Sequence, residues 1–142
     1  MIALTNEPEE MIEVLYNDCY GGWGLSKEAK DRYNELSKER SEGDDDKGTR
    51  HDPLKIKVYK ELLDKFSGPY AAIKCTSIPK RYKNYYDISE YDGKESVDID
   101  IAGYKRAQRD ARIRTILENK YMSATNKVDK LKVIFSISDD TV

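Results

Sequence analysis

Residues 17–26 read NDCYGGWGLS, and the rest of the chain is organised around this stretch. An apolar run, MIEVLY, precedes it, and a helix signal begins at Ser26. The stretch holds three glycines, the single tryptophan and one of the two cysteines of the chain. Because glycine adopts positive φ and admits close approach of other backbone, the pattern predicts a tight turn from a strand into a helix.

The composition favours a single soluble domain with a modest core. The chain has 142 residues, of which 37% are charged and 38% are hydrophobic, and its net charge of -2 gives no overall attraction to nucleic acid or anionic membranes. Two cysteines are too few for a disulfide framework or a zinc site, and no run approaches the roughly 20 apolar residues of a membrane span. We expect an intracellular protein that is not secreted, with no membrane contact, metal or cofactor.

Apolar periodicity and turn signals predict the other elements. Strands are expected at residues 11–16, 70–78, 85–91, 95–101 and 131–137, and helices at residues 27–40, 53–66 and 104–121. Ser26 and Asp52 are expected N-caps, with Pro53 at the first helical position, and Asp92-Gly93 is a hairpin turn signal. The order β-α-α-β-β-β-α-β predicts an α+β fold, a small mixed, mainly antiparallel sheet with about three helices packed on it.

Residues 17–29, NDCYGGWGLSKEA, are similar to the N-terminal signature of a family of small uncharacterised proteins of phages and large (giant) DNA viruses. That signature reads approximately N-D-C-Y-G-G-F-x-[LF]-S-x-E-A. Three further pieces resemble the same family in the same order, namely RHDP at residues 50–53, a strand ending in proline at residues 73–79 and ISEYDG at residues 88–93. The resemblance implies a fold, a viral or phage origin and a location in the host cytoplasm or the virion, but it implies no reaction.

After Glu95 the chain departs from the family, whose members tend to continue with a short segment containing a tryptophan and stop soon after. We expect residues 1–142 to form a single domain. Its parts are a lead-in, a family-like core, an addition with a basic helix and a final strand, and a loose tail, at residues 1–10, 11–95, 96–137 and 138–142 respectively.

The glycine turn is one candidate binding site, because backbone N–H groups before a helix can hold a phosphate. The spacings of the dinucleotide-binding and P-loop motifs are both absent. Cys19 and the single histidine, His51, would form a nucleophile and base only if they met, and a small buried cysteine is the alternative. Arg50 would either pair with Asp18 or face an anionic ligand. The candidate ligand-binding residues are Asp18, Cys19, Gly21, Gly22, Trp23, Arg50 and His51. No residue is assigned a catalytic role.

A basic helix is the second candidate site. Lys105, Arg109 and Arg112 recur at helical spacing, and a basic-aromatic loop lies at residues 80–83, followed by Tyr85 and Tyr86. Charge neutralisation of phosphates together with aromatic stacking is typical of contacts to RNA or single-stranded DNA, whereas a solvated amphipathic helix is the alternative. The candidate residues for nucleic acid or a partner are Lys80, Arg81, Tyr82, Lys105, Arg109 and Arg112.

Three functions follow from these features. The first is a non-catalytic accessory or virion-associated protein that acts by macromolecular interaction, with a viral or host protein complex as its partner. The second is a small nucleotide- or anion-binding protein or enzyme that uses the glycine turn with Arg50 and His51. The third is binding of nucleic acid or a ribonucleoprotein through the basic helix at residues 104–121.

Overall fold

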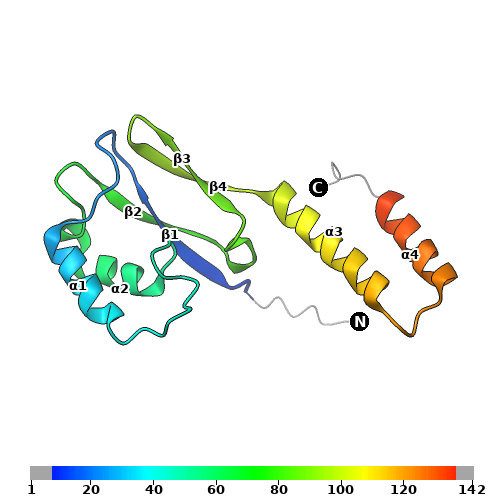
Figure 1. Cartoon of the computed structure of the whole chain (residues 1–142). Helices are drawn as coiled ribbons and strands as arrows, with labels where there is room; N and C mark the ends of the chain where they lie inside the picture. The colour runs from blue at the N-terminus through cyan, green and yellow to red at the C-terminus, as the bar shows by residue number, and fades with distance from the viewer. Residues whose placement is uncertain (1–7, 137–142) are drawn as a thin grey trace. The chain divides into compact units, whose positions relative to one another are not determined.

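The structure, a computed structural model, describes residues 8–136 (Figure 1). Its contacts group into two compact units, with the boundary between Ile99 and Asp100, and each unit is described here by itself. The predicted addition begins four residues before this boundary, at Ser96. The expected tail and most of the expected lead-in lie outside the described residues.

The first unit holds β1 (Met11–Asn17), α1 (Lys27–Ser37), α2 (Pro53–Leu62), the 3-10 turn η1 (Leu63–Lys65), β2 (Ile73–Pro79), the 3-10 turn η2 (Lys80–Tyr82), β3 (Tyr86–Tyr91) and β4 (Lys94–Ile99). The second unit holds α3 (Ile101–Glu118) and α4 (Ala124–Ser136). The predicted α+β class is confirmed.

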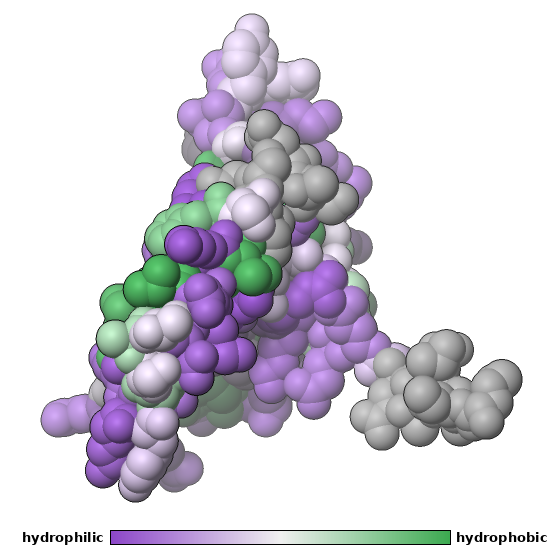
Figure 2. Space-filling model, turned by 90° about the vertical axis from the view of Figure 1, so that its right-hand side faces the viewer, coloured by the Kyte–Doolittle hydropathy of each residue, from purple (hydrophilic) through white to green (hydrophobic). Residues whose placement is uncertain are grey.

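The predicted final strand is wrong, because residues 124–136 form the helix α4. Apolar residues at alternating positions favoured a strand, but Ile134 interrupts the alternation and is the side chain that the helix buries. The helix begins after Ser123, whose hydroxyl accepts a hydrogen bond from the N–H of Asn126 at 3.1 Å. Ile137, the last residue of the predicted strand, lies outside the described residues. Figure 2 looks onto the side where Figure 1 draws α4 and shows hydrophobic side chains gathered among hydrophilic ones.

The strands form two antiparallel pairs instead of one sheet. Strand β1 pairs with β2, and β3 pairs with β4. The β3–β4 hairpin closes through Asp92 and Gly93, whose φ angles are 51° and 90°, so the predicted Asp-Gly turn is confirmed.

The second edge of β1 explains why no third strand within residues 8–136 joins this pair. The N–H of Leu15 donates to the carbonyl oxygen of Arg50 at 2.8 Å, and the N–H of Asn17 donates to the Glu95 carboxylate at 2.8 Å. A loop carbonyl and a side chain therefore satisfy donors that a neighbouring strand would otherwise bind. This arrangement brings β4 against β1 without a backbone ladder between them.

Both predicted helix caps are confirmed. The Ser26 hydroxyl accepts from the N–H of Ala29 at 3.1 Å, and the Asp52 carboxylate accepts from the N–H of Leu54 at 3.0 Å. Pro53 is the first residue of α2. These local bonds satisfy donors that have no partner within the helix.

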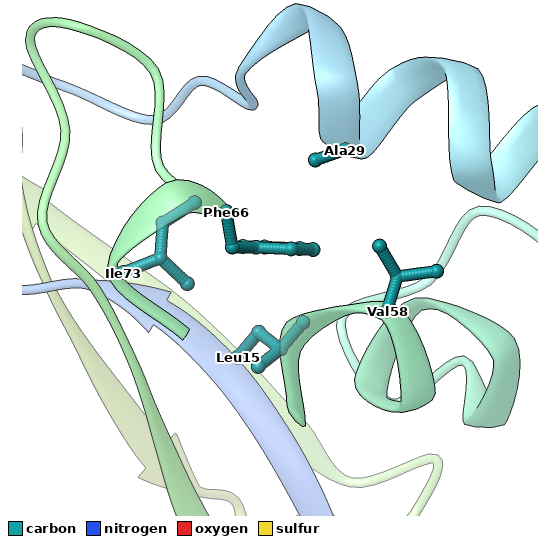
Figure 3. Close-up of a cluster of buried hydrophobic side chains, with 5 residues drawn as sticks. All are labelled: Leu15, Ala29, Val58, Phe66 and Ile73. Carbon is teal, nitrogen blue, oxygen red and sulfur yellow. The ribbon is translucent and has the colours of Figure 1, made fainter. Parts of the chain in front are cut away.

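A cluster of five buried side chains joins α1, α2, β1, β2 and the segment after η1. Figure 3 shows Phe66 at its centre, with Ala29 on one side and Leu15 on another. Val58 and Ile73 complete the cluster. Trp23, from the glycine turn, packs against this cluster, so the core and the turn are built together.

Candidate functional site at the glycine turn

The Asn17 side chain lies fully buried at the start of the glycine turn. Its Nδ2 donates to the carbonyl oxygens of Cys19 at 2.9 Å and Gly93 at 2.8 Å. Its Oδ1 accepts from the N–H of Ala72 at 2.8 Å. Both donors of the amide are satisfied, so one side chain fixes the turn, the β3–β4 hairpin and the segment before β2.

Glu95 continues this network from β4. Its carboxylate accepts two parallel hydrogen bonds from Arg50, at 2.6 and 2.9 Å, in addition to the bond from the Asn17 N–H. The Arg50 guanidinium also stacks 3.5 Å from the centre of the Trp23 ring. Burial raises the pKa of Glu95, but the bonds from Arg50 and Asn17 outweigh burial and hold that pKa below its ordinary value. The Glu95 carboxylate therefore stays ionised and hydrogen-bonded to Arg50 and to the Asn17 backbone.

The glycines permit close contact between these segments. A methyl group added at Gly21 would overlap the carbonyl oxygen of Tyr70. One added at Gly93 would lie 2.7 Å from the backbone nitrogen of Gly22 and 2.7 Å from the carbonyl oxygen of Tyr20. Gly22 also has a backbone φ angle of 108°, which residues other than glycine rarely adopt. The turn is thus packed backbone against backbone, as its glycine content predicted.

The predicted pair between Arg50 and Asp18 is wrong. Arg50 bonds to Glu95, and the Asp18 carboxylate lies 2.6 Å from the Lys74 ammonium and 3.8 Å from that of Lys94. The hydrogen bond from Lys74 lowers the pKa of Asp18. Asp18 therefore joins the turn to β2 and β4, while Arg50 joins the start of α2 to β4.

Cys19 and His51 have different partners. The Cys19 thiol donates to the carbonyl oxygen of Tyr70 at 3.3 Å. The His51 ring has Nδ1 2.5 Å from the Tyr86 hydroxyl and Nε2 3.3 Å from the Asp46 carboxylate, and burial lowers its pKa. The bonds made by these two described residues do not join the thiol to the imidazole, so the geometry lacks the nucleophile–base pair that the sequence left open.

The backbone of the turn also bonds to backbone elsewhere in the first unit. The N–H of Asp18 donates to Ala72 at 2.8 Å, and the N–H of Ser26 donates to Phe66 at 2.9 Å. Arg50, whose guanidinium stacks on Trp23 of the turn, is engaged by the Glu95 carboxylate. The Glu95 carboxylate thus occupies the position in which an anionic ligand would bind Arg50.

The predicted nucleic-acid residues fall in both units. In η2, Lys80 pairs with Glu10 at 3.2 Å, Arg81 pairs with Glu9, and Tyr82 is buried. Acidic partners therefore already offset the charge of this loop, and its aromatic ring is not open for stacking. The other three residues, Lys105, Arg109 and Arg112, lie on α3 in the second unit.

Sequence reasoning did not single out Asn17 or Glu95 as site residues. A polar residue at the end of an apolar run was a usable signal for Asn17, but nothing local marks Glu95, which stands between Lys94 and Ser96 at the start of a predicted strand. A second buried pair was also missed. Arg40 donates to Asp52 at 2.8 Å, and Tyr33 bonds to the same carboxylate. These bonds and those from backbone N–H groups overcome the effect of burial and lower the pKa of Asp52.

Exposed tyrosines surround this network. Tyr70 and Tyr91 are each 78% exposed and Tyr20 is 62% exposed. Tyr20 and Tyr91 line a hollow of about 380 Å³, together with Lys94, whose ammonium lies 5.5 Å from the centre of the Tyr20 ring. The backbone of Tyr70 lies beside the turn, because its carbonyl oxygen packs against Gly21. We call Tyr20, Tyr70 and Tyr91 the tyrosine face.

Two other features are absent from residues 8–136. In this part of the chain, no helix is long and apolar enough to cross a membrane. The same residues contain no group of three or more His, Cys, Asp or Glu side chains placed to hold a metal ion.

Comparison of the chain with family models, curated proteins and solved structures gives no match. The resemblance of residues 17–29 to the phage and giant-virus family stays a prediction.

Gly21 and Gly24 offer a matched pair of substitutions. Gly21→Ala forces a methyl group onto the Tyr70 carbonyl and is expected to lower the free energy of unfolding by about 2–4 kcal/mol. Gly24→Ala meets no atom within 4 Å and should change it by no more than about 0.5 kcal/mol. Urea denaturation measures both values. Equal midpoints for the two variants would contradict the packing described for the turn.

Glu95 should make stability depend on pH. Because its pKa is lowered in the folded chain from an ordinary value of 4.5, its contribution is complete above that pH and is lost as the pH falls through the folded-state pKa. Glu95→Gln should cost about 2–3 kcal/mol at neutral pH, and the cost should shrink toward about pH 3. Urea denaturation across this pH range measures the difference. The exposed Glu42→Gln is the control, and a cost for Glu95→Gln that is constant with pH would refute the role of the ionised carboxylate.

Proposed function

We propose that this chain is a non-catalytic accessory protein that acts by binding a viral or host protein complex. The observation that carries the proposal is the tyrosine face, three exposed tyrosines beside a turn that buried hydrogen bonds hold in place. Tyrosine supplies a large apolar surface and a hydroxyl with few rotatable bonds, and it is enriched among residues that dominate binding energy in protein interfaces.

The rigidity of the turn supports binding through this face. Tyr20 and Tyr91 stand next to backbone that Asn17 and Glu95 fix, so little conformational entropy remains to be lost when a partner binds. Exposed aromatic side chains on a flexible loop would bind at a greater entropic cost. The tyrosine face is therefore suited to a specific protein contact.

The polar groups of the turn favour this function over the two alternatives. Arg50 is engaged by Glu95, and Cys19 donates to a backbone carbonyl, so the network serves internal contacts. In the first unit, the ion pairs of Lys80 and Arg81 with acidic residues weaken the case for phosphate contacts. The similarity of residues 17–29 to proteins of phages and giant viruses supports a viral origin and a place in the virion or the host cytoplasm.

Affinity purification from infected cells tests the proposal. Tagged wild-type chain should retain a stoichiometric protein partner, and Tyr20→Ser combined with Tyr91→Ser should reduce its retention by at least about tenfold. Tyr121→Ser is the matched control, since Tyr121 is 89% exposed but lies in the second unit. The proposal fails if wild-type chain is recovered alone, or if the double variant retains the partner as well as the control does.

A further inference from the structure

The second unit presents a groove between its two helices. The groove has a volume of about 540 Å³, and its apolar lining consists of Ala111, Ile116, Met122, Val133 and Ile134. Among the described residues of this unit, only Ile134 is buried, and Val133 is 61% exposed. A helical hairpin this small cannot bury a sufficient core by itself, so apolar area remains to be covered (Figure 2).

Bonds at the turn of the hairpin set the shape of this groove. The Lys127 ammonium donates to the Leu117 carbonyl oxygen at the end of α3, at 2.9 Å. Asn119 bonds through its side chain to the N–H of Tyr121 at 3.0 Å and through its carbonyl to the N–H of Met122 at 3.3 Å. The Leu117 and Asn119 carbonyls are thus satisfied within the turn, and the bond from Lys127 links α4 to the end of α3.

The helical hairpin carries a net positive charge, which favours a binding partner with acidic residues. Residues 100–136 contain nine lysines and arginines against four aspartates and glutamates. Two of the basic residues, Arg112 and Lys130, line the groove itself, one on each helix. An occupant therefore needs an apolar stripe for the floor and acidic residues for the edges.

We propose that this groove binds an amphipathic helix with acidic flanks, supplied by a protein partner. Such a helix would lie between α3 and α4, bury its apolar stripe on the groove floor and complete a three-helix bundle. A second copy of this chain fits less well, because a symmetric interface would set these same basic surfaces against each other. Nucleic acid also fits less well, because the groove lining offers apolar side chains and no aromatic ring for stacking.

Fluorescence anisotropy with the full-length chain tests this proposal directly. The probe is a labelled helical peptide of about 18 residues with leucines along one face and glutamates on both flanks. A second labelled peptide, used for comparison, carries lysines in place of the glutamates. The wild-type chain should bind the acidic peptide at least about tenfold more tightly than the basic one.

Three variants locate the binding. Val133→Asp should weaken binding of the acidic peptide by at least about tenfold, whereas Val128→Asp, on the same helix but outside the groove lining, should not. The exposed double variant Arg112→Glu with Lys130→Glu should reverse the preference toward the basic peptide. That reversal keeps the test decisive if Val133→Asp disturbs folding. The inference does not rest on the tyrosine face, so Tyr20→Ser combined with Tyr91→Ser should bind the acidic peptide as the wild type does.

Several results would overturn the inference. Equal affinity for the two peptides, or an unchanged preference in the charge-reversed variant, removes the proposed recognition. Self-association that Val133→Asp abolishes would make a second copy the occupant. Binding of a single-stranded RNA oligonucleotide that is lost in the charge-reversed variant but kept in Val133→Asp would assign the surface to nucleic acid.

Discussion

The first unit depends on one buried amide, the side chain of Asn17. It bonds the backbone at Cys19, Ala72 and Gly93, three positions that are far apart in the sequence. A buried amide of this kind costs stability if any partner is missing, so the folded turn requires all three segments to be in place. The glycines of the turn then permit the backbone contacts that this arrangement requires.

The pair of Glu95 and Arg50 extends this constraint and limits what the turn can do. A buried carboxylate is tolerated only when its bonds are satisfied, and here it accepts from Arg50 and from the backbone of Asn17. The Trp23 ring stacks against the same guanidinium. The charged and aromatic groups that resembled a binding site therefore serve to fix the backbone, and the tyrosine face remains at the surface.

Local signals were enough to predict part of this structure. The cap at Asp52 and the turn at Asp92-Gly93 depend on neighbours in the sequence, and both were predicted. The partner of Arg50 could not be predicted, because Glu95 lies far along the chain and Asp18 offered the same charge within the turn. The two strand pairs were taken for one sheet for the same reason, since a side chain occupies the edge of β1. In α4, apolar residues at alternating positions favoured a strand, but the segment is helical and packs against α3.

Native-state hydrogen exchange tests the central claim most directly. The N–H of Asn17 bonds to the Glu95 carboxylate, and the N–H of Ala72 bonds to the Asn17 amide, so each reports one side-chain bond of the network. If these bonds hold the unit together, both amides should exchange only on global unfolding, with the same opening free energy as the ladder amides of β1 and β2. Exchange of both amides at rates typical of exposed loops would contradict this account.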